Sequence, residues 1–269
     1  MRASPIPICR LSPATRHRTS VAVADELFDM KLRALRRDRA HRMGVELFLY
    51  ERVFEDCLDR LRLVQRRFSS ALLIGCPDQE WPSRLGEFAG RVEVADPAPL
   101  FAEAAGGRRA VEDEPEPTPD AYDLCVAIGT LDTVNDLPQA LTRIRLSLAP
   151  GGFFLGALSG GDTLPQLRSA MRAADQVQGV AVPHVHPRIE ASALATLLSA
   201  SGFSDAVVDV DRVQASYAAL GRLVHDIRAM GATNILIRRS RKPLSRQAVK
   251  AAQDAFAAAG RDGRTLESF

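Results

Sequence analysis

The sequence predicts an α/β, Rossmann-like fold, in which helices cover both faces of a mostly parallel, twisted sheet. Short apolar runs typical of buried strands alternate with helical patterns over most of the chain, and this alternation favours a parallel sheet. At 269 residues, of which 46% are hydrophobic, the chain is long enough for one large core. We therefore expect a single domain over residues 25–269, with N-terminal helices at 25–67 and the Rossmann-like core at 68–269.

Composition excludes several classes of protein. No stretch approaches the ~20 consecutive apolar residues of a membrane-spanning helix, and the four cysteines are too scattered for a disulfide scaffold or a zinc ribbon. Lysine and arginine total 35 against 33 acidic residues, so no basic nucleic-acid surface is expected. These features indicate a protein of a reducing, intracellular compartment, and they leave its oligomeric state open.

Residues 1–24 are expected to form a disordered tail. They contain four arginines, three prolines and no acidic residue, and they show no sustained apolar period. A mitochondrial transit peptide has the same composition, but it would also carry an amphipathic stripe. A cytoplasmic bacterial protein is therefore our first expectation for localisation, and the mitochondrial matrix is the alternative.

The remaining elements follow from local periodicity. Residues at three- and four-residue spacing, Leu27, Phe28, Lys31, Leu32 and Leu35, begin the first of two N-terminal helices. Strands are expected at 71–74, 91–95, 108–111, 122–128, 153–158 and 206–210. Later helices are expected at 83–88, 98–104, 137–148, 163–177, 190–201, 217–230 and 245–259. The acidic, proline-punctuated stretch EDEPEPTPD (112–120) is expected to be a surface loop.

Gly75 and Asp96 end the first two strands, 21 positions apart. This is about the spacing at which an acidic residue meets a ribose in a nucleotide-binding βαβ unit. As an exposed carboxylate at a strand end, Asp96 would accept from ribose hydroxyls and contribute little to folding. An ordinary turn at Gly75 and a helix cap at Asp96 explain the two residues equally well. A nucleotide-dependent oxidoreductase would show G-x-G-x-x-G here, which is absent.

Five segments carry a family resemblance. They are LFDMKLRALRRDRA (27–40), VNDLPQAL (134–141), LAPGGFFLGALSGGDTLPQLR (148–168), PHVHPR (183–188) and MGATN (230–234). In this order they resemble class I S-adenosylmethionine (SAM) dependent methyltransferases, and within them the complex I assembly factor 5 group, whose characterised member is an arginine hydroxylase. The resemblance implies SAM as cofactor and a protein or carrier as substrate, with a complex I subunit as one candidate.

The resemblance also implies site residues. On the cofactor side these are Gly75, Cys76, Asp96, Asp113 and Ile128. On the substrate side they are Asn135, Thr163 and His186, with Asp162, His184 and Asp136 as catalytic candidates.

Each of these assignments has a plainer alternative. Asp113 equally fits a solvated charge in an acidic run, and Thr163 equally fits a helix cap. Asp162, together with Asp132 or Asp136, could pair with an arginine substrate. His184 and His186 are too few for a metal site, and they also fit a rigid lid.

The chain departs from the family pattern at the first strand. The pattern is similar to D-x-G-x-G-x-G, and the four fixed positions hold Leu73, Gly75, Pro77 and Gln79. Pro77 removes an N–H donor, and the missing glycines restrict the approach of backbone to ligand. A second departure is LDT (131–133), where the pattern resembles LHW.

Two functions are therefore carried forward. The first is a SAM-dependent enzyme that performs methyl transfer or protein arginine hydroxylation. The second is a non-catalytic assembly or scaffold protein that has kept the fold and lost tight SAM binding.

The chain's end carries a further expectation about the sheet. The related family continues past DGR (262–264) into a final strand beside the fifth, so that strand is expected to be truncated here. Residues 265–269 should make at most a short edge pairing, because few residues remain to pair.

Overall fold

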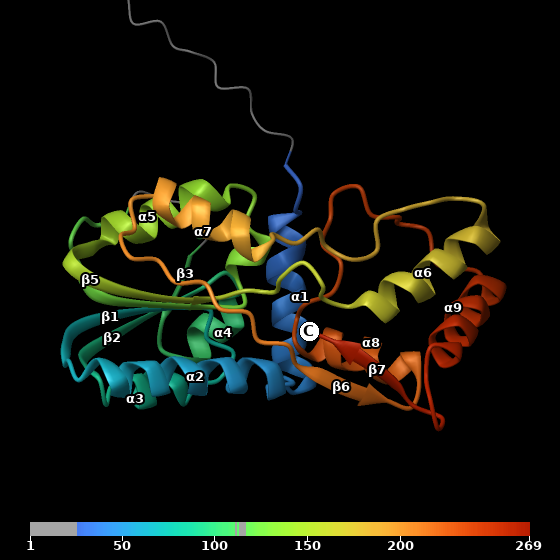
Figure 1. Ribbon diagram of the computed structural model, residues 1–269, viewed down its shortest axis with the longest axis horizontal. Coiled ribbons are helices and arrows are strands. Elements are labelled where there is room, and N and C mark those ends of the chain that lie inside the picture. Colours follow the sequence, from blue (N-terminus) through green and yellow to red (C-terminus); the bar gives the residue numbers. More distant parts are fainter. Residues whose placement is uncertain (1–25, 111, 113–116) are drawn as a thin grey trace, which may run out of the picture.

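The computed structural model describes residues 26–110, 112 and 117–269. The predicted N-terminal tail lies outside these residues, as does Asp113. The described chain forms two lobes, with helix α1 (Met30–Met43) between them (Figure 1). One lobe is built around a parallel sheet, and the other around three helices and a small antiparallel pair of strands.

The larger lobe contains the predicted parallel sheet. Its strand order is β3-β2-β1-β4-β5, and all of its pairings are parallel. The strands are β1 (Phe68–Ile74), β2 (Ala89–Asp96), β3 (Arg108–Arg109), β4 (Tyr122–Ile128) and β5 (Leu148–Ala157). The predicted fold class is thus confirmed, including the two N-terminal helices.

Helices cover both faces of this sheet (Figure 1). α2 (Phe48–Val64) and α3 (Trp81–Leu85) lie on one face, and α5 (Leu137–Ser147) and α7 (Ala191–Ala200) on the other. Successive residues of β1 enter opposite cores, because Leu73 packs with the α2 side and Ile74 with the α5 side. The apolar runs of the central strands therefore reflect burial on both faces.

The smaller lobe has a core of its own. Its elements are α6 (Pro165–Gln178), α8 (Leu220–Ala229), α9 (Arg246–Ala258), β6 (Gln214–Tyr217) and β7 (Thr265–Ser268). Leu223, Ala248 and Phe256 are almost fully buried between its helices. β6 and β7 pair antiparallel apart from the main sheet.

The end of the chain completes this lobe. β7 makes the short pairing predicted for residues 265–269, four residues long and with β6 as its partner. Helix α6 begins after Leu164, which has a φ of 62° and provides no side-chain cap. Instead, the fully buried carboxylate of Glu267 accepts from the amides of Gln166 (3.1 Å) and Leu167 (2.8 Å). A residue about 100 positions away thus caps the helix.

The predicted strand at 206–210 is wrong. Its residues form no strand, although Ala206 and Val208 do pack against the α5 side of the core while Val207 is 79% exposed. The segment then reaches α2, where Asp209 pairs with Arg60 and Asp211 with Arg52. Side-chain contacts with two elements hold this segment in position, and a ladder of backbone hydrogen bonds is not formed.

Helix α1 connects the two lobes, and its buried face is charged. It packs against α4 (Pro99–Ala104) of the sheet lobe and α8 of the other. Arg33 and Arg37 are buried on it, whereas Leu35 of the predicted apolar stripe is 60% exposed. The helix was predicted correctly, but its inward face was not.

Candidate functional site

The carboxyl ends of β1, β2 and β4 meet where the site was predicted. Gly75 follows β1 with a φ of +80°, and a methyl group built on it would lie 2.4 Å from the carbonyl oxygen of Ile128. Only glycine fits this close approach. The amide of Cys76 donates to Asp96 at the end of β2 (2.9 Å). The structure therefore brings together four of the five predicted cofactor residues, namely Gly75, Cys76, Asp96 and Ile128.

Asp96 is fully buried and accepts four hydrogen bonds. Its Oδ1 accepts from Arg37 Nε (3.1 Å) and the Ala98 amide (2.8 Å). Its Oδ2 accepts from Arg37 Nη2 (2.6 Å) and the Cys76 amide. A carboxylate offers about four lone-pair sites, so none is left for a ribose. The expectation of an exposed, ligand-facing carboxylate is wrong, because α1 supplies a cation that occupies it.

Arg33, one turn before Arg37 on α1, makes a second buried ion pair. Its guanidinium binds both carboxylate oxygens of Glu112 (2.7 and 2.8 Å) and the carbonyl oxygen of Thr130 (2.7 Å). For Arg37, burial alone would lower the guanidinium pKa, but the charge and hydrogen bonds of Asp96 outweigh burial and raise it. Both arginines are thus held as cations between two elements of the sheet edge. We refer to Arg33 and Arg37 as the α1 arginine pair.

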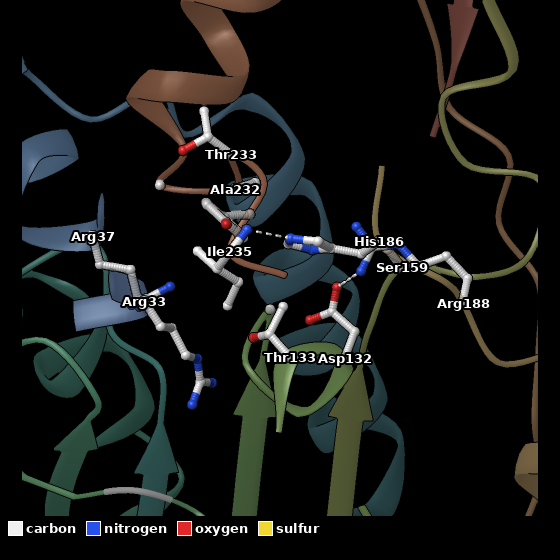
Figure 2. A pocket seen from close by; sticks show the side chains of 13 residues that line it. Arg33, Arg37, Asp132, Thr133, Ser159, His186, Arg188, Ala232, Thr233 and Ile235 are labelled. Carbon is white, nitrogen blue, oxygen red and sulfur yellow. Dashed lines mark hydrogen bonds and ion pairs between the residues drawn. The ribbon is translucent and has the colours of Figure 1, made fainter. Parts of the chain in front are cut away.

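Tyr50 of α2 fills the space beside the α1 arginine pair. Its ring packs so closely on Gly129 that a methyl group there would lie 2.4 Å from Tyr50 Cε1. Its hydroxyl donates to the carbonyl oxygen of Met230 (2.9 Å), and burial raises its pKa. A cavity of about 50 Å³ remains at the centre of the site (Figure 2).

SAM does not fit this arrangement. The small cavity, at about 50 Å³, is below the usual range of about 300–1,000 Å³ for small-molecule pockets, and none of the predicted cofactor residues that the structure describes lines it. Leu73, which replaces the acid of the family pattern, is fully buried in the core and does not line the small cavity. Asp96 has no acceptor capacity left. The described residues therefore form a closed version of the pocket that the family uses.

The opposite wall of the cavity is built from the later motifs. His186 Nε2 accepts from the Ile235 amide (3.0 Å), and Asn234 Nδ2 donates to the Pro183 carbonyl (2.8 Å). PHVHPR and the segment that begins with MGATN are thus joined by two hydrogen bonds. Burial, followed by the charge of Arg188, lowers the pKa of His186 to about 4. Its imidazole is therefore a neutral acceptor that holds two segments together.

Arg188 ends the PHVHPR motif and reaches the LDT segment. It forms an ion pair with Asp132, and both side chains are at least nine-tenths buried. Figure 2 shows Arg188 and Asp132 across the cavity from the α1 arginine pair. Asp132 was considered as a partner for an arginine substrate, and here it is occupied by an arginine of the same chain.

The other predicted substrate and catalytic residues lie apart. The side chain of Asn135 binds the backbone near the start of the described chain. It accepts from the Leu27 and Phe28 amides and donates to the Phe28 carbonyl. Asp136 caps α5 through the Gln139 amide (2.9 Å). These two residues fix the backbone at the points where they lie.

Of three further predicted residues, Asp162 and Thr163 lie between β5 and α6, and His184 lies between α6 and α7. The side chain of Asp162 is 85% exposed and faces Arg212 at 3.5 Å. Thr163 is buried, and its carbonyl accepts from Arg168. His184 Nε2 lies 2.8 Å from Asp175 Oδ1, outside the small cavity. The structure does not gather the three catalytic candidates, Asp162, His184 and Asp136, at one point.

The residues that close the site were missed as functional candidates. Arg33 and Arg37 lie in the first resemblance segment, and their four-residue spacing places them on one helical face. Two arginines at that spacing on a helix next to a predicted acidic strand end were the available signal. Their long-range partners, Glu112 and Asp96, cannot be read from periodicity.

Two further searches of the described residues gave no site. Among them there is no group of three or more histidine, cysteine, aspartate and glutamate side chains that could hold a metal ion. No helix in this part of the chain is both long and apolar enough to cross a membrane.

Comparison with known proteins agrees with the fold. A family model described as a methyltransferase domain matches residues 45–207. The YcgJ protein from Bacillus subtilis, a solved structure, matches with a TM-score of 0.50 at 12% identity, covering 78% of this chain and 91% of that one. At this identity the likeness concerns the fold alone.

The sequence relatives include proteins with two different named activities. The mitochondrial arginine-hydroxylase NDUFAF5 of Rattus norvegicus is 31% identical over 220 residues, 77% of this chain and 64% of the relative. A malonyl-(acyl-carrier protein) O-methyltransferase of Xylella fastidiosa is 36% identical over 126 residues, 44% of this chain and 41% of the relative. The chain thus spans less than two thirds of the rat relative's length. With more than half of its residues matched by the family model, the chain belongs to the class I SAM-dependent methyltransferase domains.

Proposed function

We propose that this protein is a non-catalytic assembly or scaffold protein that keeps the methyltransferase fold and works without SAM. The buried carboxylate of Asp96 carries this proposal, because Arg37 and the Cys76 and Ala98 amides together use every acceptor site that would otherwise meet the ribose. The losses at Leu73, Pro77 and Gln79 point in the same direction. Mutations that close a cofactor site are tolerated when the remaining function is partner binding.

The partner that we propose is a protein or a carrier protein. NDUFAF5 is named as an arginine-hydroxylase, and the Xylella enzyme is named for its acyl-carrier substrate. The resemblance to the complex I assembly factor 5 group makes a respiratory-complex subunit the first candidate. The bacterial cytoplasm, or else the mitochondrial matrix, is the compartment proposed with it.

Isothermal titration calorimetry with SAM tests the proposal. No heat at about 1 mM ligand is expected, whereas the Kd of a working cofactor site lies near the micromolar range. A SAM-binding methyltransferase titrated under the same conditions serves as the control for the ligand. Micromolar binding to this chain would overturn the proposal.

A test in cells addresses the scaffold role directly. Cells that lack the protein are supplied with the wild type or with Asp96→Asn combined with Arg37→Met, which removes the carboxylate and its cation together. Native gels then report assembly of the respiratory complex. Full assembly with both chains is expected, and assembly with the wild type alone, at equal protein levels, would contradict a SAM-independent role.

The alternative is a SAM-dependent enzyme that methylates or hydroxylates a protein or carrier substrate. The named activities of the relatives favour it. It requires Arg37 to leave Asp96, which exposes a buried carboxylate and breaks two charge-assisted hydrogen bonds. SAM binding that depends on Asp96 is the observation that would support it.

A further inference from the structure

A second, much larger cavity lies on the other side of α1. It measures about 940 Å³ and opens between α6, α8 and the segments 180–188 and 232–244. His186 and Arg188 line both this cavity and the small one. Its volume is at the upper end of the range for small-molecule sites.

Cations surround this cavity. Besides Arg188, which pairs with Asp132, they are Arg36, Arg228, Arg239, Arg241 and Lys242, and we call the cavity the basic cleft. Asp175 is its one acidic lining residue among those described, and it is already engaged by His184 and by the Val182 amide. Within the described chain, only Arg239 of the five cations has an ion pair, with Asp29 at 3.4 Å. The cleft therefore has an excess of positive charge.

Arg36 lies at the centre of this charge. Burial lowers its pKa, and repulsion by Arg39, Arg239 and Arg228 lowers it further. Its Nε is buried without a hydrogen-bond partner in the described part of the chain. Convergent cations with unpaired donors are unfavourable in an empty protein and favourable around an anion.

Arg188 and Thr233 add unused donors to the same wall. The side chain of Arg188 is only 5% exposed, and its Nε has no partner among the described residues, although another nitrogen of the same guanidinium pairs with Asp132. Thr233 Oγ1 is likewise buried and without a described partner. Both residues line the basic cleft. The donors therefore come from three separate parts of the chain.

One wall of the cleft is apolar. Leu167 and Met171 come from α6, Val224 and Ile227 from α8, and Leu244 from the segment that follows. These side chains belong to the core of the smaller lobe and reach the cavity wall. A ligand that covers them needs an apolar part, because a small inorganic anion would leave them in contact with water.

We propose that the basic cleft binds an amphipathic phosphomonoester, with its phosphate among Arg36, Arg228 and Arg239 and its apolar chain along α6 and α8. A phosphate offers three acceptor oxygens and up to two negative charges, which suits several converging guanidinium groups better than a single carboxylate does. A cavity of this volume, lined by both cations and apolar side chains, favours a small ligand over an extended acidic peptide. The proposal is independent of whether the closed pocket binds SAM.

Calorimetry with octyl phosphate, at concentrations below micelle formation, tests the proposal. Octyl phosphate should bind at least ten times more tightly than inorganic phosphate or octanoate, because each of these lacks one half of the matching chemistry. Arg36→Gln combined with Arg228→Gln should weaken octyl phosphate binding at least tenfold. The control, Arg222→Gln combined with Arg246→Gln, removes the same charge from exposed positions outside the cleft and should bind as the wild type does.

Several outcomes would overturn the proposal. One is the absence of binding at millimolar octyl phosphate, and another is equal weakening by the two double variants, which would indicate unspecific charge attraction. Equal affinity for inorganic phosphate would remove the apolar half of the argument. Tighter binding of hexaglutamate than of octyl phosphate would instead identify the cleft as a site for an acidic protein segment.

Discussion

Replacement of Arg37 by alanine tests the closed pocket most directly. In the wild type, Arg37 donates two of the four hydrogen bonds to the fully buried carboxylate of Asp96. A hydrogen bond to a charged group contributes about 1.5–3 kcal/mol, and removal of one partner of a buried ion pair costs about 3–5 kcal/mol. We therefore expect Arg37→Ala to lower the free energy of unfolding by about 3–5 kcal/mol.

Urea denaturation followed by tryptophan fluorescence measures this change. Trp81 is the single tryptophan of the chain, it is fully buried, and it stacks on Phe54 at 4.2 Å. Its emission therefore reports loss of the core on the α2 face of the sheet. Arg60→Ala is the matched control, since Arg60 is 42% exposed in its pairs with Asp56 and Asp209. Exposed pairs contribute about 0–1 kcal/mol.

A double-mutant cycle separates the pair from its surroundings. Asp96→Asn should also destabilise the fold, because Arg37 would then be buried without its counter-charge. The double variant Arg37→Met with Asp96→Asn should lose less than the sum of the two single changes, since it leaves no buried charge unpaired. Loss of less than about 0.5 kcal/mol in Arg37→Ala would refute the reasoning.

Three further changes probe the rest of the site. The free energy of unfolding should fall by about 3 kcal/mol between pH 6.5 and pH 4 through His186. Its pKa of about 4 lies below that of an unfolded histidine, so its neutral form stabilises the fold above pH 6.5 and this contribution is lost on acidification. His186→Gln should flatten this part of a urea-melt series across pH, and an unchanged slope would contradict the assignment. Pro77→Gly with Gln79→Gly should give no calorimetric SAM binding, because the α1 arginine pair still fills the pocket; a gain to micromolar affinity would show that the pocket is open. Glu267→Ala should destabilise the fold by about 1–3 kcal/mol through two uncapped amides of α6, and a thermal melt equal to that of the wild type would argue against the cap.

The fold was readable from the sequence because its signals are local. Residues 71–74 and 122–128 are apolar runs buried on both faces, and such runs are typical of central parallel strands. The segment 206–210 is also largely apolar but forms no strand. Ala206 and Val208 pack beside the sheet while Val207 is exposed, and local pattern does not reveal whether such a segment pairs with a neighbouring edge.

The closed site was not readable, because its determinants are long-range. Arg37 and Asp96 are 59 positions apart, and Arg33 and Glu112 are 79 apart. Periodicity favoured Leu35 as a core residue, yet it is exposed and its charged neighbours are buried. Asp96 and Gly75 lie at neighbouring strand ends, but the side chain that pairs with Asp96 comes from a helix before the first strand.

The placement of α1 has a thermodynamic consequence. Arg36 and Arg37 are consecutive, so a helix directs their side chains about 100° apart, one toward the basic cleft and the other toward Asp96. A displacement of α1 that freed Asp96 would also withdraw Arg36 from the cleft. An anion bound to Arg36 would therefore hold the pocket shut, and a ligand admitted to the pocket would expel the anion by the same factor, because linkage between two sites is reciprocal. One rigid helix would thus make each site an effector of the other.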